Sequence, residues 1–380
     1  MEKIYLDNAA SSPMDERVLE AMMQYFTKAG NASSIHAFGK PLKVALEDSR
    51  DNIADFLGVK PKEIFFTSGG TESNNTALKG VSLKNYKGEK RHIISSTVEH
   101  PAVLDILKYI CEKFNFSLTL LKPDKNGEIT PGAVLKEIKK DTLLISLMHA
   151  NNETGLITDI GSIAKEKGDV YLHSDTVQSA GKVKLNFKKM GIDFASISGH
   201  KIYGPKGIGV LYINEKSKID KFSHGGGQER DMRGGTENIP AIVGLSKAFD
   251  LLRENIDKDI LHYKTLRDYL IKKLKDAYGE YVLFNSNERG LYNIVNISFN
   301  TDKLNAAGDM LLIRLDLNGI AVSGGSACSS GSLKPSRVLL ESGRDEKTAM
   351  ASLRISFGRK NRIDETDYFM EVLKDLVRKK

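Results

Sequence analysis

Short apolar runs alternate with amphipathic segments through most of this 380-residue chain. The amphipathic segment Pro101–Phe114 has apolar residues on one face at helical spacing, and it lies between two of the apolar runs. This alternation is typical of βαβ units, so we expect an α/β fold with a mainly parallel, seven-stranded sheet. The expected strands are Ile64–Phe66, His92–Ser95, Leu118–Leu121, Leu143–Met148, Val170–His173, Phe194–Ser198 and Ile208–Ile213.

The pattern changes after Pro240, where long helical stretches replace the alternation. This change predicts two parts: a large domain of residues 16–254, and a smaller α+β domain of residues 1–15 and 255–380. In the large domain, Gly58 is expected to end an early helix as its C-cap. Further expected elements are helices at Asp15–Thr27, Lys40–Leu57, Ala241–Glu254, Asp257–Ala277 and Asp364–Val377, and strands at Leu291–Phe299 and Leu353–Phe357.

Composition excludes several classes of protein. No stretch reaches about 20 consecutive apolar residues, and Asp7 lies where a signal peptide has its apolar core, so we expect a cytoplasmic protein without a membrane span. The net charge of +7 comes from basic residues scattered among acidic ones, which does not predict direct nucleic-acid binding. The two cysteines, Cys111 and Cys328, have no CxxC or Cys/His spacing, so neither a disulfide framework nor a metal site is expected.

Three polar segments follow predicted strands. The first, residues 66–74, contains Gly69 and Gly70 and leads into a helix, so its N–H groups suit an anion; a helix cap without a ligand is the alternative. In the second, Asp175 ends a strand and points to the same crevice, unless it is a turn cap. In the third, Lys201 ends a strand beside glycines. Burial lowers the pKa of a lysine and leaves a neutral amine that can form a Schiff base; a solvated surface lysine is the alternative.

These three segments together match what pyridoxal phosphate requires. The cofactor needs an anion site for its phosphate, a lysine for its aldehyde and a carboxylate for its pyridine nitrogen. His100, at a fourth strand end, is a candidate for covering the cofactor ring; a helix N-terminal histidine without a ligand is the alternative.

At these residues the sequence resembles the class V aminotransferase group of fold-type I pyridoxal-phosphate enzymes, and within it the cysteine desulfurases. The resemblance runs nearly end to end and implies the fold-type I architecture. The segments that carry it are 5–10, 33–36, 67–73, 98–100, 148–155, 198–207 and 325–328.

The resemblance implies a role for individual residues. Lys201 would bind the cofactor covalently, Asp175 would pair with the pyridinium, and His100 would stack on the ring and move protons. The phosphate and the remaining polar atoms of the cofactor would be bound by Gly70, Thr71, Asn152, Gln178, Ser198, His200 and Thr236. In this family the threonine comes from the neighbouring subunit, so a homodimer is implied.

The smaller domain would supply the groups specific to the reaction. Cys328 lies in a run rich in glycine and serine, which favours an exposed loop that presents one thiol, whereas Cys111 suits a helix packing position. The resemblance makes Cys328 the nucleophile that takes sulfur from L-cysteine as a persulfide. Arg354 and Asn152 would bind the substrate, although the residues alone suggest only a salt-bridge partner for Arg354.

Alternatives stay open at this point. A selenocysteine lyase or another class V lyase or aminotransferase would share the cofactor residues. A metallohydrolase built on His149 and Glu153, or on His173 and Asp175, is weakly suggested because no third ligand is evident. The chain ends soon after the helix near Val377, whereas relatives that feed an iron-sulfur scaffold carry a longer tail. The sulfur acceptor is therefore open between an iron-sulfur scaffold, a tRNA-thiolation protein and another sulfur carrier.

Overall fold

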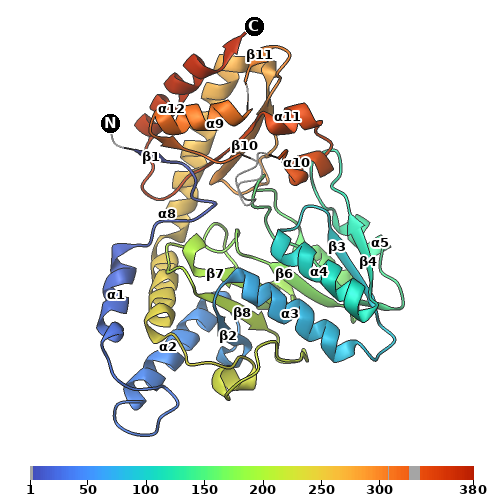
Figure 1. Ribbon diagram of the computed structural model, residues 1–380, viewed down its shortest axis with the longest axis vertical. Helices are drawn as coiled ribbons and strands as arrows, with labels where there is room; N and C mark the ends of the chain where they lie inside the picture. The colour runs from blue at the N-terminus through green and yellow to red at the C-terminus, as the bar shows by residue number, and fades with distance from the viewer. Residues whose placement is uncertain (1–2, 307, 325–333) are drawn as a thin grey trace.

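The computed structural model describes residues 3–306, 308–324 and 334–380. The described residues form a central seven-stranded sheet in the order β2-β8-β7-β6-β5-β3-β4 (Figure 1). Within it β8 is antiparallel to both neighbours, and the pairs from β7 to β4 are parallel, which confirms the mainly parallel sheet. The strands are β2 (Ile64–Thr67), β3 (His92–Ser96), β4 (Ser117–Leu121), β5 (Thr142–Ser146), β6 (Tyr171–Asp175), β7 (Phe194–Ser198) and β8 (Gly209–Ile213).

Helices cover both faces of this sheet because its strands carry apolar side chains on both faces, even at the β2 edge. Along β2, Phe65 packs into one hydrophobic cluster, whereas Ile64 and Phe66 pack into another on the opposite face. The α3 and α4 side chains belong to the first cluster, and those of α2 and the first part of α8 to the second. The helices are α1 (Glu16–Phe26), α2 (Lys40–Leu57), α3 (Gly70–Asn85), α4 (Pro101–Phe114), α5 (Pro131–Lys136), α6 (Ile160–Glu166), α7 (Phe187–Met190) and α8 (Ile239–Tyr278).

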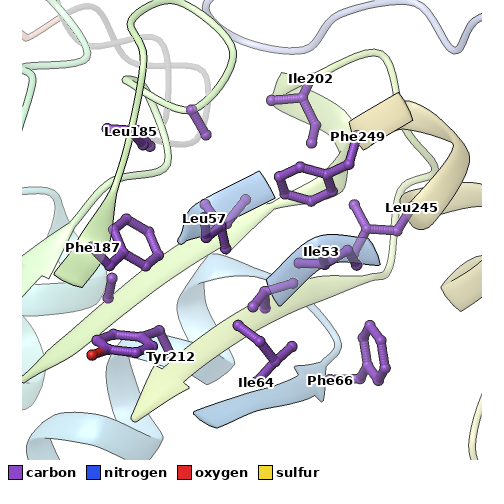
Figure 2. Packing of buried hydrophobic residues seen from close by; sticks show 14 of the residues in the cluster. Ile53, Leu57, Ile64, Phe66, Leu185, Phe187, Ile202, Tyr212, Leu245 and Phe249 are labelled. Carbon is purple, nitrogen blue, oxygen red and sulfur yellow. The ribbon is translucent and has the colours of Figure 1, made fainter. Parts of the chain in front are cut away.

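The second cluster joins sequence-distant elements under the sheet. Figure 2 shows Ile53 and Leu57 of α2 beside Phe249 of α8 and Tyr212 of β8. Each of these side chains is at most 2% exposed, so truncating Phe249 to alanine would cost about 3 to 5 kcal/mol of folding free energy. Gly58 ends α2 with φ +68°, which confirms the predicted C-cap.

The expected break between two helices near residue 255 is wrong. Residues Ile239–Tyr278 form one helix of 40 residues. Ile256, inside the expected break, is buried in it, and no proline or glycine interrupts the helix there. In Figure 1 the first half of α8 lies beside α1 and α2, and its second half lies beside α12. The predicted domain limit at residue 254 therefore falls inside a continuous helix, and it stays a prediction.

The elements in the upper part of Figure 1 contribute side chains to a separate hydrophobic cluster. It contains Ile4 and Leu6 together with side chains from residues 263–377, so the N-terminal strand packs with the C-terminal region. No helix in the described ranges is long and apolar enough to span a membrane. The elements here are β1 (Ile4–Tyr5), β9 (Val282–Phe284), β10 (Ile294–Phe299), β11 (Leu304–Asn305), α9 (Gly308–Leu317), β12 (Ile320–Ala321), α10 (Arg337–Glu341), α11 (Glu346–Met350), β13 (Ser352–Ser356), α12 (Ile363–Leu376) and β14 (Arg378–Lys379).

Candidate active site

A cavity of about 610 Å³ lies at the carboxyl ends of the parallel strands. Ligands of α/β folds bind at this edge because successive loops converge there. All the predicted cofactor-binding residues except Thr236 line this one cavity, as does the predicted substrate-binding residue Arg354. The lining residues from that prediction are Gly70, Thr71, His100, Asn152, Asp175, Gln178, Ser198, His200 and Lys201.

Lys201 ends a short 3₁₀ turn, Gly199–Lys201, directly after β7. Its Nζ donates hydrogen bonds to the carbonyl oxygens of Ala9 and Ala10, at 2.6 and 2.7 Å. Gln178 Nε2 donates to the same Ala9 carbonyl at 3.0 Å. The N-terminal segment therefore forms one wall of the cavity and holds the Lys201 amine there by two backbone acceptors.

Asp175, at the end of β6, is fixed by a chain of buried polar groups. Its Oδ2 accepts from Asn74 Nδ2 at 2.7 Å, and its Oδ1 accepts from the Val177 N–H at 3.0 Å. His173 forms hydrogen bonds through Nε2 with Asn74 Oδ1 and through Nδ1 with the Ser146 hydroxyl. Burial lowers the pKa of His173 to about 3, so this ring is neutral at neutral pH. Asn74 was not among the predicted site residues, and His173 was suggested only as a weak candidate metal ligand.

Two more histidines line the cavity. His100 is the N-cap of α4, where its Nδ1 accepts from the Ala102 N–H at 3.1 Å, an arrangement that leaves the ring proton on Nε2. Burial lowers the pKa of His100, while the negative charge of Asp175 opposes that shift. The His200 pKa falls to about 4 because of burial and the nearby Lys201 and Lys206 charges. Both rings are therefore neutral at neutral pH.

The start of α3 forms a tight cradle at the cavity floor. The helix begins at Gly70, so its first N–H groups have no acceptor within the helix. Gly69 adopts φ +151°, and a Cβ at Gly70 would lie 2.7 Å from Val177 Cγ2. The backbone therefore comes close to the cavity with donors and a positive helix end, which fits a phosphate group.

Arg354 lies in β13 and is 5% exposed. Its Nη2 pairs with Asp7 Oδ1 at 2.8 Å and its Nη1 donates to the Asn152 carbonyl at 2.8 Å. The salt bridge that the residues alone suggested is thus present, with Asp7 as a partner that sequence reasoning missed. A guanidinium has five N–H donors, so these two contacts leave donors for a ligand carboxylate.

Thr236 is exposed and does not line this cavity. Its segment is nevertheless tied to the cradle, because Arg233 Nε pairs with Glu72 Oε1 at 2.9 Å and Glu72 accepts from the Ser68 N–H. The structure therefore keeps Thr236 on the surface near the start of α3.

The two cysteines differ in what the structure describes. Cys328 lies outside the described residues. Cys111 is half-buried in α4 against the hydrophobic cluster, as expected for a packing residue, and burial raises the pKa of its thiol. Of the weakly suggested metal ligands, His149 lies beside a separate surface cavity, while Glu153 accepts from Ser336. Among the described residues, no three His, Cys, Asp or Glu side chains are grouped to hold a metal ion.

Comparison with known proteins gives consistent matches over the whole chain. The family model described as aminotransferase class-V matches residues 4–369. A protein named cysteine desulfurase IscS from Dictyoglomus turgidum is 42% identical over 99% of this chain and 95% of the relative. One of the same name from Methanosarcina thermophila is 43% identical over 99% of this chain and 92% of the relative.

Solved structures with this fold are also similar in sequence. A structure titled NifS-like protein superposes with a TM-score of 0.90 at 35% identity, covering 98% of this chain and 99% of the other. A NifS-like protein from Rickettsia africae superposes with a TM-score of 0.87 at 33% identity, covering 99% of each chain.

Proposed function

The chain belongs to the class-V aminotransferase family, and we propose that it is a pyridoxal-phosphate-dependent cysteine desulfurase. It would convert L-cysteine to L-alanine and leave the sulfur as a persulfide on Cys328. The observation that carries this proposal is a single cavity lined by the Lys201 amine, the Asp175 carboxylate and the start of α3, with Arg354 on the same lining. An amine, an acid, an anion site and a carboxylate-binding arginine are the groups that this reaction needs.

The sheet side of the cavity would hold the cofactor. Pyridoxal phosphate, when bound, supplies an aldehyde that condenses with amines and a ring that withdraws electrons from the bound substrate. The α3 N-terminus, with Thr71, Ser198 and His200, would bind the phosphate. Asp175 would keep a proton on the pyridine nitrogen, since Asn74 and Val177 orient its carboxylate.

The chain's own residues would then bind the substrate and move protons. Arg354 and Asn152 would orient the L-cysteine carboxylate. The Lys201 amine would remove the substrate α-proton, because a neutral amine in this cavity is a base of suitable strength. His100, neutral with its proton on Nε2, would donate and accept protons during sulfur loss.

Sulfur transfer would need the thiolate of Cys328. That thiolate would form an S–S bond to the substrate sulfur while the substrate C–S bond breaks, and the β-carbon would take the electron pair and then a proton to become the alanine methyl group. The persulfide would pass to an acceptor protein, either an iron-sulfur scaffold or a tRNA-thiolation protein. A cytoplasmic location is part of the proposal, since Cys328 must be a free thiol.

We also propose a homodimer in which Thr236 completes the phosphate site of the neighbouring subunit. Thr236 is exposed and lies outside its own cavity. Large apolar side chains on α1 and the segment after it are exposed, among them Met23, Phe26, Ile35 and Phe38. The mass in solution, measured by sedimentation, would be that of two chains; a monomeric, fully active protein would contradict the proposal.

The test of the function is to load the protein with pyridoxal phosphate and supply L-cysteine with a thiol reductant. Wild type should release alanine and sulfide. Cys328→Ala should keep the visible absorbance of the bound cofactor and lose sulfide release, whereas the control Cys111→Ala should behave as wild type. Continued desulfuration by Cys328→Ala would contradict the proposal that Cys328 is the nucleophile.

A further inference from the structure

A second lysine, Lys182, is buried directly behind Lys201. It follows the turn after β6, its side chain is enclosed, and the whole residue is 6% exposed. Its Nζ donates to the main-chain carbonyl oxygen of Lys201 at 3.2 Å. Lys182 does not line the cavity, and its hydrogen bond reaches the backbone of the lysine that would bind the cofactor.

The surroundings of Lys182 are aromatic. Its Nζ lies 5.2 Å from the ring centre of Tyr203 and 5.8 Å from that of Tyr263, and the two phenol oxygens are 2.8 Å apart in a hydrogen bond. In the part of the chain that the structure describes, no carboxylate forms an ion pair with Lys182. Burying an ammonium without an anionic partner destabilises the fold, so stability does not explain a lysine at this position.

Other charged groups face this lysine from each element packed against it. Arg359, after β13, lies 4.4 Å from the Tyr203 ring and pairs with Asp259 of α8 at 2.7 Å. Burial lowers the Lys182 pKa to about 7, helped by the positive charges of Arg359 and Lys201 and opposed by Asp259. At neutral pH the charged and neutral forms of Lys182 are therefore about equally populated. The charged form repels a positive charge on Lys201.

The backbone beside Lys201 is also under constraint. Tyr203 has φ +63°, a left-handed conformation that is strained for a residue other than glycine. Its N–H donates to Ser12 Oγ at 2.8 Å and its carbonyl accepts from the Asp15 N–H at 3.0 Å, so the N-terminal segment holds it there. This strained conformation lies two residues from Lys201, so it indicates that the Lys201 main chain must be held in one position.

We propose that Lys182 is a positioning residue for Lys201: it fixes the Lys201 main chain and places a positive charge behind it that disfavours protonation of the Lys201 nitrogen. A neighbouring cation lowers the proton affinity of a lysine, which is one way to make an amine reactive at neutral pH. On the cavity side Lys201 faces Asp175, His100 and His200, and Asp175 acts in the opposite direction. This inference rests on the proposed function, since it concerns the lysine that would carry the cofactor.

The test is the pH titration of the visible absorption band of the cofactor-loaded protein. Lys182→Met removes the charge at nearly constant shape, and Lys182→Arg makes the charge permanent. The midpoint should rise by about half a pH unit or more in Lys182→Met and should stay at or below the wild-type value in Lys182→Arg. Coincident midpoints for wild type and Lys182→Met would overturn the inference.

Two further variants keep the test decisive if a Lys182 variant fails to fold. Tyr263→Phe removes a neighbouring hydroxyl without changing charge, so its midpoint should stay at the wild-type value even if its stability falls. Asp259→Asn removes the negative charge that favours the charged form of Lys182, so the midpoint should rise towards that of Lys182→Met; an unchanged midpoint would contradict the inference. A wild-type protein that shows no visible band with pyridoxal phosphate would instead refute the proposed function.

Discussion

The two sides of the cavity are built in different ways. On the sheet side, Asp175 ends β6 and Lys201 follows the parallel neighbour β7, and the hydrogen bonds between these two strands set their spacing. On the other side, Arg354 is positioned by contacts across almost the whole chain, since its partner Asp7 lies 347 residues away. The positions of the side chains on the sheet side are set by adjacent strand ends. The position of Arg354 is set by packing of the N-terminal segment against β13.

Because the two sides are built separately, cofactor binding and substrate binding should be separable. The sheet side offers an amine, a carboxylate and a helix N-terminus, which suit pyridoxal phosphate. The opposite side offers a guanidinium, which suits an amino-acid carboxylate. A change on the sheet side should therefore alter the colour of the loaded protein, and a change on the Arg354 side should alter turnover without altering colour.

The largest expected effect is that of Lys201→Ala. The variant should lose both the visible absorption of the bound cofactor and all measurable desulfuration, because no other residue is proposed to bind the aldehyde. Absorption spectra and alanine release measure the two losses. Lys184→Ala, at an exposed position, is the control. A Lys201→Ala protein with wild-type absorption would show that the cofactor does not bind through Lys201.

Asp175→Asn should have the next largest effect. The cofactor should stay bound, but desulfuration should fall by about 100-fold or more, since a buried charge aimed at the reacting group is lost. Asn74→Ala should show a smaller fall, because Asn74 acts by orienting Asp175. Steady-state kinetics with L-cysteine measure both. Equal and small effects of the two variants would argue against a role for the Asp175 charge.

A smaller effect, confined to substrate binding, is expected for Arg354→Lys on the opposite side. It should raise KM for L-cysteine by about 10- to 100-fold while leaving the visible absorption unchanged, because lysine keeps the charge but cannot form two parallel hydrogen bonds. Arg253→Lys, in a partly exposed ion pair with Asp55, provides the control. A changed absorption spectrum in Arg354→Lys would mean that the two sides are not separable.

The smallest effect concerns stability rather than turnover. His173 has a pKa of about 3 in the folded protein against 6.5 ordinarily, so the unfolded chain binds more protons between these values. Its contribution is complete above about pH 6.5 and falls with decreasing pH, by up to about 1.4 kcal/mol per pH unit. Denaturant unfolding at several pH values should show a shallower acid slope for His173→Gln than for wild type or the exposed control His224→Gln; equal slopes would contradict this.

The strand ends were predictable because their signals are local. The apolar run Phe194–Ser198 stops at Gly199, and the structure forms β7 over the same residues. The direction of β8 was not predicted, since periodicity does not state which way a strand runs. The helix α8 was expected to break near residue 255, but burial of Ile256 continues its apolar face.

The site was predictable only where it follows strands. Asp175 and Lys201 come directly after apolar runs, so their place at the sheet edge follows from the fold class. The Asp7–Arg354 pair had no such signal, because two parts of the chain must first meet across the N-terminal strand. Asn74 lies inside α3, where an asparagine has many ordinary uses, and its contact with Asp175 depends on how α3 crosses the sheet.

The most direct test of the central claim is to reduce the cofactor-loaded protein with borohydride and to find the modified lysine by peptide mapping. We expect the cofactor to be attached to the peptide that contains Lys201, and Lys201→Ala to leave no modified lysine. Attachment at Lys182, Lys206 or any other lysine in the wild-type protein, or no attachment at all, would contradict it.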